Sequence, residues 1–325
     1  MFQISELYPI KFEPILKEKI WGGNKLKHFF NKKSEGNIGE SWEISGVDDS
    51  VSIVKSGKLK GENLNGLIEK YKEKLVGNKV FKTFGNTFPL LFKFIDAKED
   101  LSVQLHPNDA LAKKRHNSFG KTEMWYILDA EKDGKLVLGF NSEMNESIYK
   151  KHLLENSLSE ILNSEKVKIG DSFFIQTGTL HAIGAGVVLA EIQQTSDITY
   201  RIFDYNRPGI DGKLRKLHAD LALDAIDYNA PNAKLDYLET DNNPVELCKN
   251  EYFLTNKIVL TRTLKRDLSK VDSFVVYMCV EGDGIIEIDN YSESIIKGET
   301  ILIPAEIKEL NIKSNSATFL EVYIP

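Results

Sequence analysis

Alternating apolar and polar residues dominate this chain and predict that most of it forms β-strands. The pattern is clearest at Ser102, Gln104 and His106, which would share one face of a strand because successive side chains point to opposite faces. The apolar segment 88–95 precedes this strand, and the segment 167–204 combines a dense strand pattern with glycine turns. We therefore expect a mainly β fold.

Helical spacing of apolar residues is confined to short segments. The helix predicted from residue 64 is expected to end at Gly77. Asn108 or Asp109 is expected to cap a helix over 110–115. Residues 141–166 are predicted to form a small helical insertion, and 218–226 a further helix.

The segments 124–128 and 135–140 both have strand character. They are separated by a polar loop that contains Asp133 and Gly134. Since Asp-Gly is a common turn sequence between paired strands, the two segments are predicted to form a β-hairpin.

Two distant segments repeat one another weakly, each with a turn glycine, an apolar strand and a second turn. Gly170 begins the copy that leads to His181, whereas Gly298 begins a copy that continues through Pro304 without a histidine. A repeated small β-barrel with one working and one degenerate site is the simplest explanation. The units expected are 1–140 with 167–240, the helical insertion 141–166, and 241–325.

Composition narrows the setting without indicating a chemistry. The 325 residues are 42% hydrophobic, enough for two domains with a large core. A formal charge of -6 argues against nucleic acid as a partner, and no apolar run reaches the roughly 20 residues that span a bilayer. The N-terminal segment lacks a signal-peptide pattern, and Cys248 and Cys279 form no CxxC motif. A cytoplasmic setting is expected.

Polar residues on strand faces indicate a candidate metal site. Lys121 and Glu123 alternate onto one face of the next strand, and His181 follows a turn that could aim it into a barrel mouth. Together with Gln104 and His106, they offer two imidazoles, a carboxylate and an amide oxygen. These ligands suit zinc, and they also permit manganese or iron(II).

Several other residues have simpler interpretations. Trp125 is expected to buttress the strand that carries Glu123. Near residue 40, the face with Glu40 and Trp42 is expected to pack, and the opposite face, with Glu43, to look onto a cavity. Single histidines are usually surface or hydrogen-bonded core residues, which is the interpretation adopted for His28, His116, His152 and His218.

Four segments resemble, in the same order, the motifs of type I phosphomannose isomerases. The chain reads LSVQLHP at 101–107, similar to SxQxHP, and GKTEM at 120–124, similar to KxEM. It reads GTLHAIGAG at 178–186, similar to GxxHAxxxG, and EIQQTSDITYR at 191–201, similar to the family's E…SD…R segment. With WGG and GESWEIS upstream, the resemblance spans most of residues 20–205.

This resemblance implies a fold of two cupin-like double-stranded β-helix (jelly-roll) barrels, the first catalytic and the second degenerate. It implies a zinc-dependent aldose–ketose isomerase that interconverts mannose 6-phosphate and fructose 6-phosphate, with one Zn²⁺ per chain. Ser102, Lys121 and Arg201 would bind the substrate's phosphate or its developing charge. The implied zinc ligands are Gln104, His106, Glu123 and His181.

Proton transfer between C1 and C2 through an enediol would require a general base. Glu191, Asp197 and Lys121 are candidates for it, and Arg201 offers a guanidinium fork suited to phosphate or enediolate oxygens. The alternative for Arg201 is a structural ion pair with Asp197 or Asp204. The catalytic residues expected are Arg201, Lys121 and Glu191.

Two other functions stay open at this point. The chain could be another cupin metalloenzyme, such as a dioxygenase, or a non-catalytic sugar-binding cupin. Lys121 and Arg201 favour an anionic substrate over these alternatives. The expected partner is a phosphorylated hexose, bound by a monomer or weak homodimer that has no nucleic-acid or membrane partner.

Overall fold

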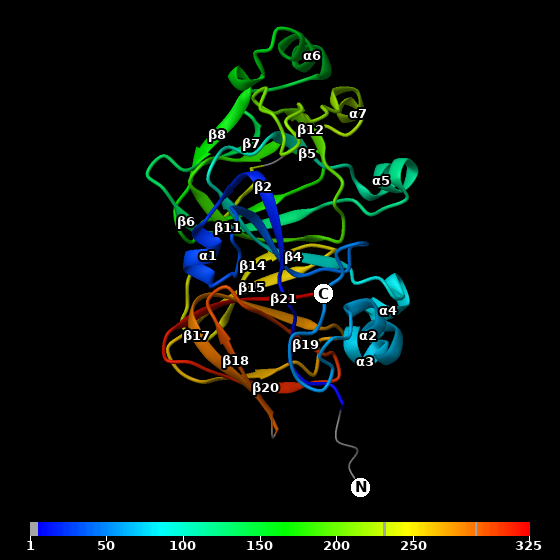
Figure 1. Ribbon diagram of the computed structural model, residues 1–325, viewed down its shortest axis with the longest axis vertical. Coiled ribbons are helices and arrows are strands. Elements are labelled where there is room, and N and C mark those ends of the chain that lie inside the picture. Colours follow the sequence, from blue (N-terminus) through cyan, green and yellow to red (C-terminus); the bar gives the residue numbers. More distant parts are fainter. Residues whose placement is uncertain (1–5, 230–231, 290) are drawn as a thin grey trace.

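The computed structural model describes residues 6–229, 232–289 and 291–325. Strands form three sheets and the helices are short, so the mainly β prediction is confirmed (Figure 1). The first five residues, part of the segment tested for a signal-peptide pattern, lie outside the described residues. Within the described ranges, no helix is long and apolar enough to cross a membrane.

A seven-stranded antiparallel sheet is the middle layer, in the order β13-β9-β6-β11-β4-β2-β3. Both faces of its central strands are covered, because alternate residues enter different cores. On β4, Phe92 and Phe94 enter a core shared with the C-terminal part, while Ile95 faces a second core. Its strands are β2 (Ile15–Gly23), β3 (Ile38–Ile44), β4 (Leu90–Ala97), β6 (Glu123–Ala130), β9 (Ser172–Ile175), β11 (Val187–Gln194) and β13 (Lys234–Leu235).

A five-stranded sheet covers one side of this layer, in the order β12-β5-β10-β7-β8. Its register places Gln104 opposite His181 on one side and Arg201 on the other. Gln104, His181 and Arg201 therefore lie side by side on three adjacent strands. Its strands are β5 (Val103–Leu105), β7 (Lys135–Phe140), β8 (Leu162–Lys166), β10 (His181–Ile183) and β12 (Tyr200–Phe203).

A nine-stranded sheet forms the C-terminal part, and the N-terminal strand β1 (Ile10–Lys11) pairs with its strand β19 (Thr300–Ile303). The rings of Phe88 and Phe274 lie 4.6 Å apart and join this part to the middle layer. Its other strands are β14 (Pro244–Lys249), β15 (Leu254–Leu260), β16 (Leu264–Asp267), β17 (Val275–Ile288), β18 (Tyr291–Ile296), β20 (Glu309–Lys313) and β21 (Ala317–Tyr323).

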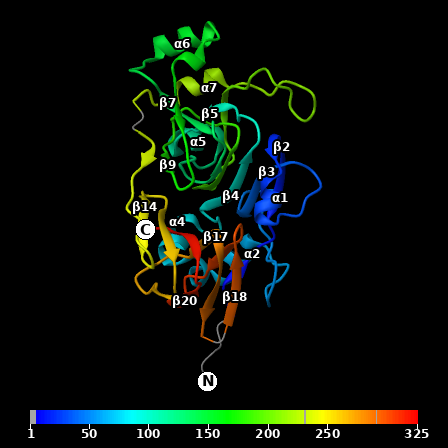
Figure 2. The same cartoon turned by 90° about the vertical axis from the view of Figure 1, so that its left-hand side faces the viewer.

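The helices lie at the edges of these layers. Figures 1 and 2 show α6 at the end of the molecule farthest from the C-terminal sheet, whereas α2–α4 lie beside that sheet. The Asp272 carboxylate accepts the backbone N–H groups of Asn78 and Lys79, so the C-terminal part caps α4. The helices are α1 (Lys25–Phe30), α2 (Leu64–Tyr71), α3 (Glu73–Val76), α4 (Asn78–Phe84), α5 (Asp109–His116), α6 (Glu146–Leu154) and α7 (Ala219–Leu223), with a 3₁₀ turn at Leu158–Glu160.

The predicted helices at 110–115 and 218–226 are confirmed as α5 and α7, and Asn108 caps α5 through its side chain. The single helix predicted before Gly77 is two helices, because Lys72 adopts a φ of 49° between α2 and α3. The prediction that helix extends through 141–166 is wrong, since α6 ends early and β8 follows. β8 pairs with β7 at the edge of the five-stranded sheet, and this pairing outweighs the helical spacing of the apolar residues in the segment.

The predicted hairpin between 124–128 and 135–140 is also wrong, although both segments are strands. β6 pairs with β11 and β9, whereas β7 pairs with β10 and β8 in another sheet. Residues 131–134 therefore carry the chain from one sheet to the other. An Asp-Gly turn can serve such a corner as well as a hairpin.

The weak repeat corresponds to two similar turns. Gly170 has a φ of 90° and leads into β9, and Gly298 has a φ of 84° and leads into β19. Each following strand pairs with a long strand, β6 or β17. We propose that the chain forms two β units that divide near residue 241, with α6 and the 3₁₀ turn inserted between β7 and β8 of the first.

The C-terminal part contains a buried carboxylate that is fully hydrogen-bonded. Arg266 donates two hydrogen bonds of 2.8 and 2.9 Å to the Glu321 carboxylate, which is completely buried. Tyr277 and Asn256 donate to the same carboxylate at 2.7 and 2.9 Å. The polar side chains buried at this place in the C-terminal part therefore fulfil one another's hydrogen-bonding capacity.

Replacing Glu321 with Gln should lower the free energy of unfolding by about 3 kcal/mol, because it leaves the Arg266 guanidinium in a partly buried place without its counter-charge. Urea denaturation measures this change. The matched control is Glu309→Gln, which breaks an ion pair between the exposed side chains of Lys265 and Glu309 and should leave the midpoint unchanged. An unchanged midpoint for Glu321→Gln would contradict the prediction.

Candidate metal centre

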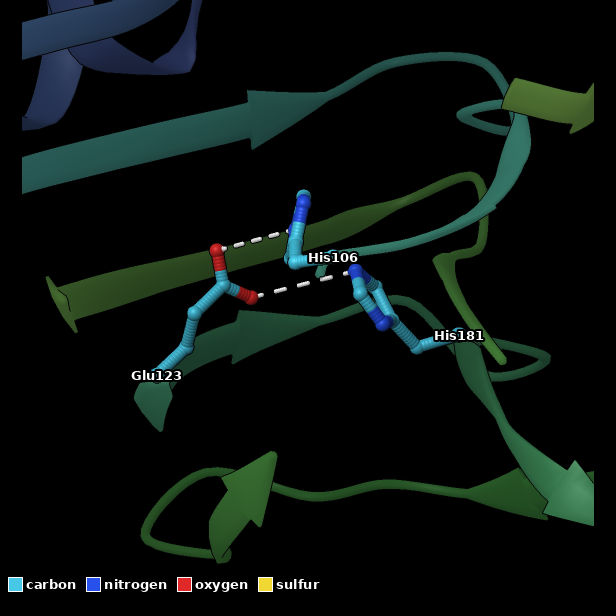
Figure 3. A group of neighbouring side chains, drawn as sticks. All are labelled: His106, Glu123 and His181. Carbon is cyan, nitrogen blue, oxygen red and sulfur yellow. Dashed lines mark ion pairs between the residues drawn. The ribbon is translucent and has the colours of Figure 1, made fainter. Parts of the chain in front are cut away.

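Three side chains at the ends of three separate strands converge on one point (Figure 3). His106 follows β5, Glu123 begins β6, and His181 begins β10. Nε2 of His106 lies 3.3 Å from one carboxylate oxygen of Glu123, and Nε2 of His181 lies 3.8 Å from the other. The donor atoms all lie within 4.8 Å of one another, and each side chain is 1% exposed.

Backbone carbonyls fix both imidazoles in the tautomer that a metal requires. Nδ1 of His106 donates to the carbonyl of Ile198 at 2.8 Å, and Nδ1 of His181 donates to the carbonyl of Thr179 at 2.9 Å. Because a carbonyl only accepts, each Nδ1 carries the proton and each Nε2 presents a lone pair.

The electrostatics keep these donors in their metal-binding protonation states. Burial and the nearby Lys121 lower the pKa of His106 to about 3, and burial also lowers the pKa of His181. Burial opposes ionisation of Glu123, but Lys121 and the two imidazoles hold the pKa of its carboxyl well below its ordinary value. The site therefore holds two neutral imidazoles and one carboxylate.

Three of the donor atoms are buried without a hydrogen-bond partner. They are Nε2 of His106 and both carboxylate oxygens of Glu123. Since buried polar atoms are almost always paired, these atoms indicate a site built for a cation. Two imidazoles and a carboxylate match the ligand types that zinc takes in enzymes.

Gln104 lies beside this cluster. Its amide nitrogen is 3.4 Å from Nε2 of His181, and its amide oxygen accepts from the Ser102 hydroxyl at 3.4 Å. The sequence predicted an oxygen ligand here. A half-turn of the amide would exchange its two atoms and bring the oxygen toward the imidazoles.

A cavity of about 280 Å³ opens next to the cluster, and it includes every residue predicted to bind substrate. Ser102, Lys121 and Arg201 all line it, as do Glu191 and Asp197. Five cationic and three acidic side chains line the wall, so the cavity favours an anion. The lining cations are Lys19, Lys93, Lys121, Arg201 and Arg215.

Arg201 faces the cavity rather than a structural ion pair. Its Nε donates to the Ser102 hydroxyl at 3.3 Å, and Nη1 donates to the carbonyl of Lys216. Asp204, one proposed partner, instead accepts from Arg215 and Arg207. Burial and the nearby Arg215 lower the pKa of Arg201 from its ordinary value, although it stays cationic at neutral pH.

Glu191 lies in a buried network on the middle sheet. It accepts from Nζ of Lys93 at 2.8 Å and from the Trp125 indole N–H at 2.9 Å. Burial and the nearby Glu123 carboxylate raise the pKa of Glu191 above its ordinary value, against the opposing charge of Lys93. Trp125 also packs edge-on against His181 at 5.4 Å, as expected of a buttress.

Sequence reasoning missed several residues of the cavity. Lys93 was hidden inside an apolar strand, where its alternation with Phe92 and Phe94 could have indicated an inward polar position. The assignment of faces near residue 40 is wrong, because Glu40 lines the cavity and Glu43 pairs with Lys32 elsewhere. Lys93, Lys19 and the Trp42 indole offset the burial of Glu40 and lower its pKa to about 2.

The remaining histidines with side-chain contacts have ordinary hydrogen-bond partners. His116 pairs with the Tyr200 hydroxyl, His152 with Ser157, and His218 accepts from the Arg201 backbone. In the part of the chain that the structure describes, one group of three or more His, Cys, Asp or Glu residues has metal-binding geometry.

Comparison with known proteins assigns the chain to a protein family. The model of the type I phosphomannose isomerase catalytic domain matches residues 10–152, and the mannose-6-phosphate isomerase cupin domain matches residues 244–324. The mannose-6-phosphate isomerase ManA of Bacillus subtilis is 35% identical over 94% of this chain and 96% of its own length. The chain belongs to the type I phosphomannose isomerase family. The predicted resemblance and the cupin assignment are therefore confirmed.

Further members of the family extend the match. The mannose-6-phosphate isomerase of Streptococcus mutans is 32% identical over 92% of this chain and 93% of its own length. The crystal structure of the mannose 6-phosphate isomerase from Bacillus subtilis superposes with a TM-score of 0.89 at 30% identity, covering 98% of this chain and 100% of that one. These relatives are enzymes, and the chain belongs to their family.

Replacing either His106 or His181 with Ala should abolish zinc binding while the fold is kept, because each change removes one of three converging donors. Elemental analysis of the purified variants measures zinc per chain, and circular dichroism checks the fold. His28→Ala, at an exposed histidine outside the cluster, is the control and should bind zinc like the wild type. Full zinc content in both cluster variants would refute the assignment of these ligands.

Proposed function

We propose that this chain is a zinc-dependent mannose-6-phosphate isomerase, which interconverts mannose 6-phosphate and fructose 6-phosphate. The observation that carries this proposal is that three metal-donor atoms without a hydrogen-bond partner lie beside a cavity wall rich in cations. A phosphorylated hexose would place its sugar oxygens near the donors and its negative charge along the wall. Family membership supports the same substrate.

His106, Glu123, His181 and the amide oxygen of Gln104 would hold one Zn²⁺. The ion supplies Lewis-acid polarisation of the sugar oxygens and stabilises the negative charge that develops on them. The donor tautomers and the ionised carboxylate prepare the chain for this ion.

Arg201, Lys121 and Ser102 are the proposed substrate-binding residues. The Arg201 guanidinium can donate in a planar fork to phosphate or enediolate oxygens. Lys121 is 5% exposed and lies 3.2 Å from Glu123, so its charge is held next to the reacting end. The Ser102 hydroxyl contacts both Arg201 and Gln104 and connects the two ends of the cavity.

Proton transfer between C1 and C2 needs a group that accepts and returns one proton. Glu191, whose raised pKa favours this exchange, is the proposed proton carrier, and Lys121 and Arg201 would stabilise the enediol that forms. Asp197 is an alternative, since it also lines the cavity but is exposed.

The proposal includes a cytoplasmic setting and a monomer or weak homodimer. A cupin dioxygenase would need no cation-rich wall, and a non-catalytic sugar-binding protein would need no set of metal donors. In this chain the cation-rich wall and the metal donors lie side by side. They favour the isomerase.

A coupled assay of mannose 6-phosphate conversion to fructose 6-phosphate tests the proposal. Activity should disappear after chelation and return when zinc is added, because the donors lose and regain their ion. Magnesium added instead of zinc is the control, since it prefers oxygen ligands and should restore little activity. A fully metallated protein with no conversion would contradict the proposal.

Arg201→Ala should leave zinc content unchanged and reduce kcat/KM by roughly 10²-fold or more, because it removes a cationic fork from the substrate without touching a metal donor. Steady-state kinetics with elemental analysis measure both effects. Arg262→Ala, which removes an exposed arginine far along the chain, should keep wild-type kinetics. Normal turnover by Arg201→Ala would return this residue to a structural role.

A further inference from the structure

A tyrosine of the C-terminal unit contacts the start of the helix that follows the metal ligand His106. Tyr252 lies in the turn between β14 and β15, and its hydroxyl donates to Oδ2 of Asp109 at 2.7 Å. Asp109 is the first residue of α5, three positions after His106. Burial and this hydrogen bond raise the pKa of Tyr252, so its hydroxyl keeps the proton that it donates.

The other oxygen of Asp109 holds the segment that precedes Glu123. Oδ1 accepts the backbone N–H of Gly120 at 2.7 Å and the side-chain amide of Gln194 at 3.1 Å. Gly120 lies so close that a Cβ there would be 2.8 Å from the backbone nitrogen of Asp109. Asp109 thus joins the loop after His106 to the strand entry of Glu123.

Gln194 extends this connection by two further hydrogen bonds. The side-chain oxygen of Gln194 accepts the backbone N–H of Thr122 at 3.0 Å. The backbone N–H of Gln194 donates to the Thr122 carbonyl at 3.2 Å. The backbone from Gly120 to Thr122 is therefore fixed at both ends by groups that meet at Asp109. Lys121 lies between these fixed points and Glu123 follows them.

We propose that Tyr252 is a positioning residue of the metal centre, which acts through Asp109 on the placement of Lys121 and Glu123. This inference rests on the proposed metal site and gives the C-terminal unit a role in it. Metal affinity depends on donor positions within about 0.2 Å, and partners behind the ligands commonly change affinity by about 10–100-fold. A hydrogen bond that orients the segment carrying one donor, Glu123, should have an effect at the lower end of that range.

Tyr252→Phe removes the hydroxyl alone and tests this role. Zinc affinity, measured by competition with a chromophoric chelator, should fall about tenfold, and the visible spectrum of the Co²⁺-loaded protein should change. Neither readout requires turnover. The matched control is Tyr291→Phe, which removes a hydroxyl that donates to Glu293 at 2.9 Å within the C-terminal unit and should leave both readouts unchanged.

A second comparison separates positioning from a general loss of stability. If Tyr252 acts through Asp109, Asp109→Ala with Tyr252→Phe should bind zinc no more weakly than Asp109→Ala alone. Additive losses would overturn the proposed route. Wild-type zinc affinity in Tyr252→Phe, with or without a lower melting temperature, would overturn the inference while leaving the metal site intact. Absence of zinc binding by the wild type would overturn both.

Discussion

The buried approach of two imidazole nitrogens to the Glu123 carboxylate is the constraint around which the rest of the structure is arranged. Removing a carboxylate from water is costly, and its two oxygens have no hydrogen-bond partner. Lys121 at 3.2 Å offsets part of this cost, and a divalent cation would offset the rest. The donors are held in place by carbonyls, by a buttressing indole and by strand register.

The middle sheet links this site to the rest of the molecule. On β4, β6 and β11, one face enters the core shared with the C-terminal unit. The other face carries Lys93 and Glu191 into the cavity and Glu123 into the metal-donor cluster beside it. A change in packing on one face is therefore felt by polar groups on the other. The C-terminal unit supports the sheet that holds the site, and Tyr252 connects this unit to Asp109, three residues after His106.

Local pattern predicted much of this arrangement, and its failures have a common cause. Alternation placed Ser102, Gln104 and His106 on one face, and a capping residue located α5, because both depend on neighbours in sequence. The pairing of β6 with β9 and β11 depends on strands that lie far away along the chain, so the hairpin prediction failed. Lys93 was missed because a strand buried on both faces reads as uniformly apolar. The contact of Tyr252 with Asp109 joins residues 143 positions apart and left no local signal.

X-ray absorption at the zinc edge of the purified, zinc-loaded protein reports directly on the ligands of the proposed metal centre. We expect one zinc per chain, surrounded by nitrogen and oxygen at about 2.0–2.2 Å, with scattering from two imidazole rings. Both described cysteines are buried and free, and neither belongs to the cluster. A sulfur shell at about 2.3 Å, or a spectrum without imidazole scattering, would refute the proposed zinc ligands.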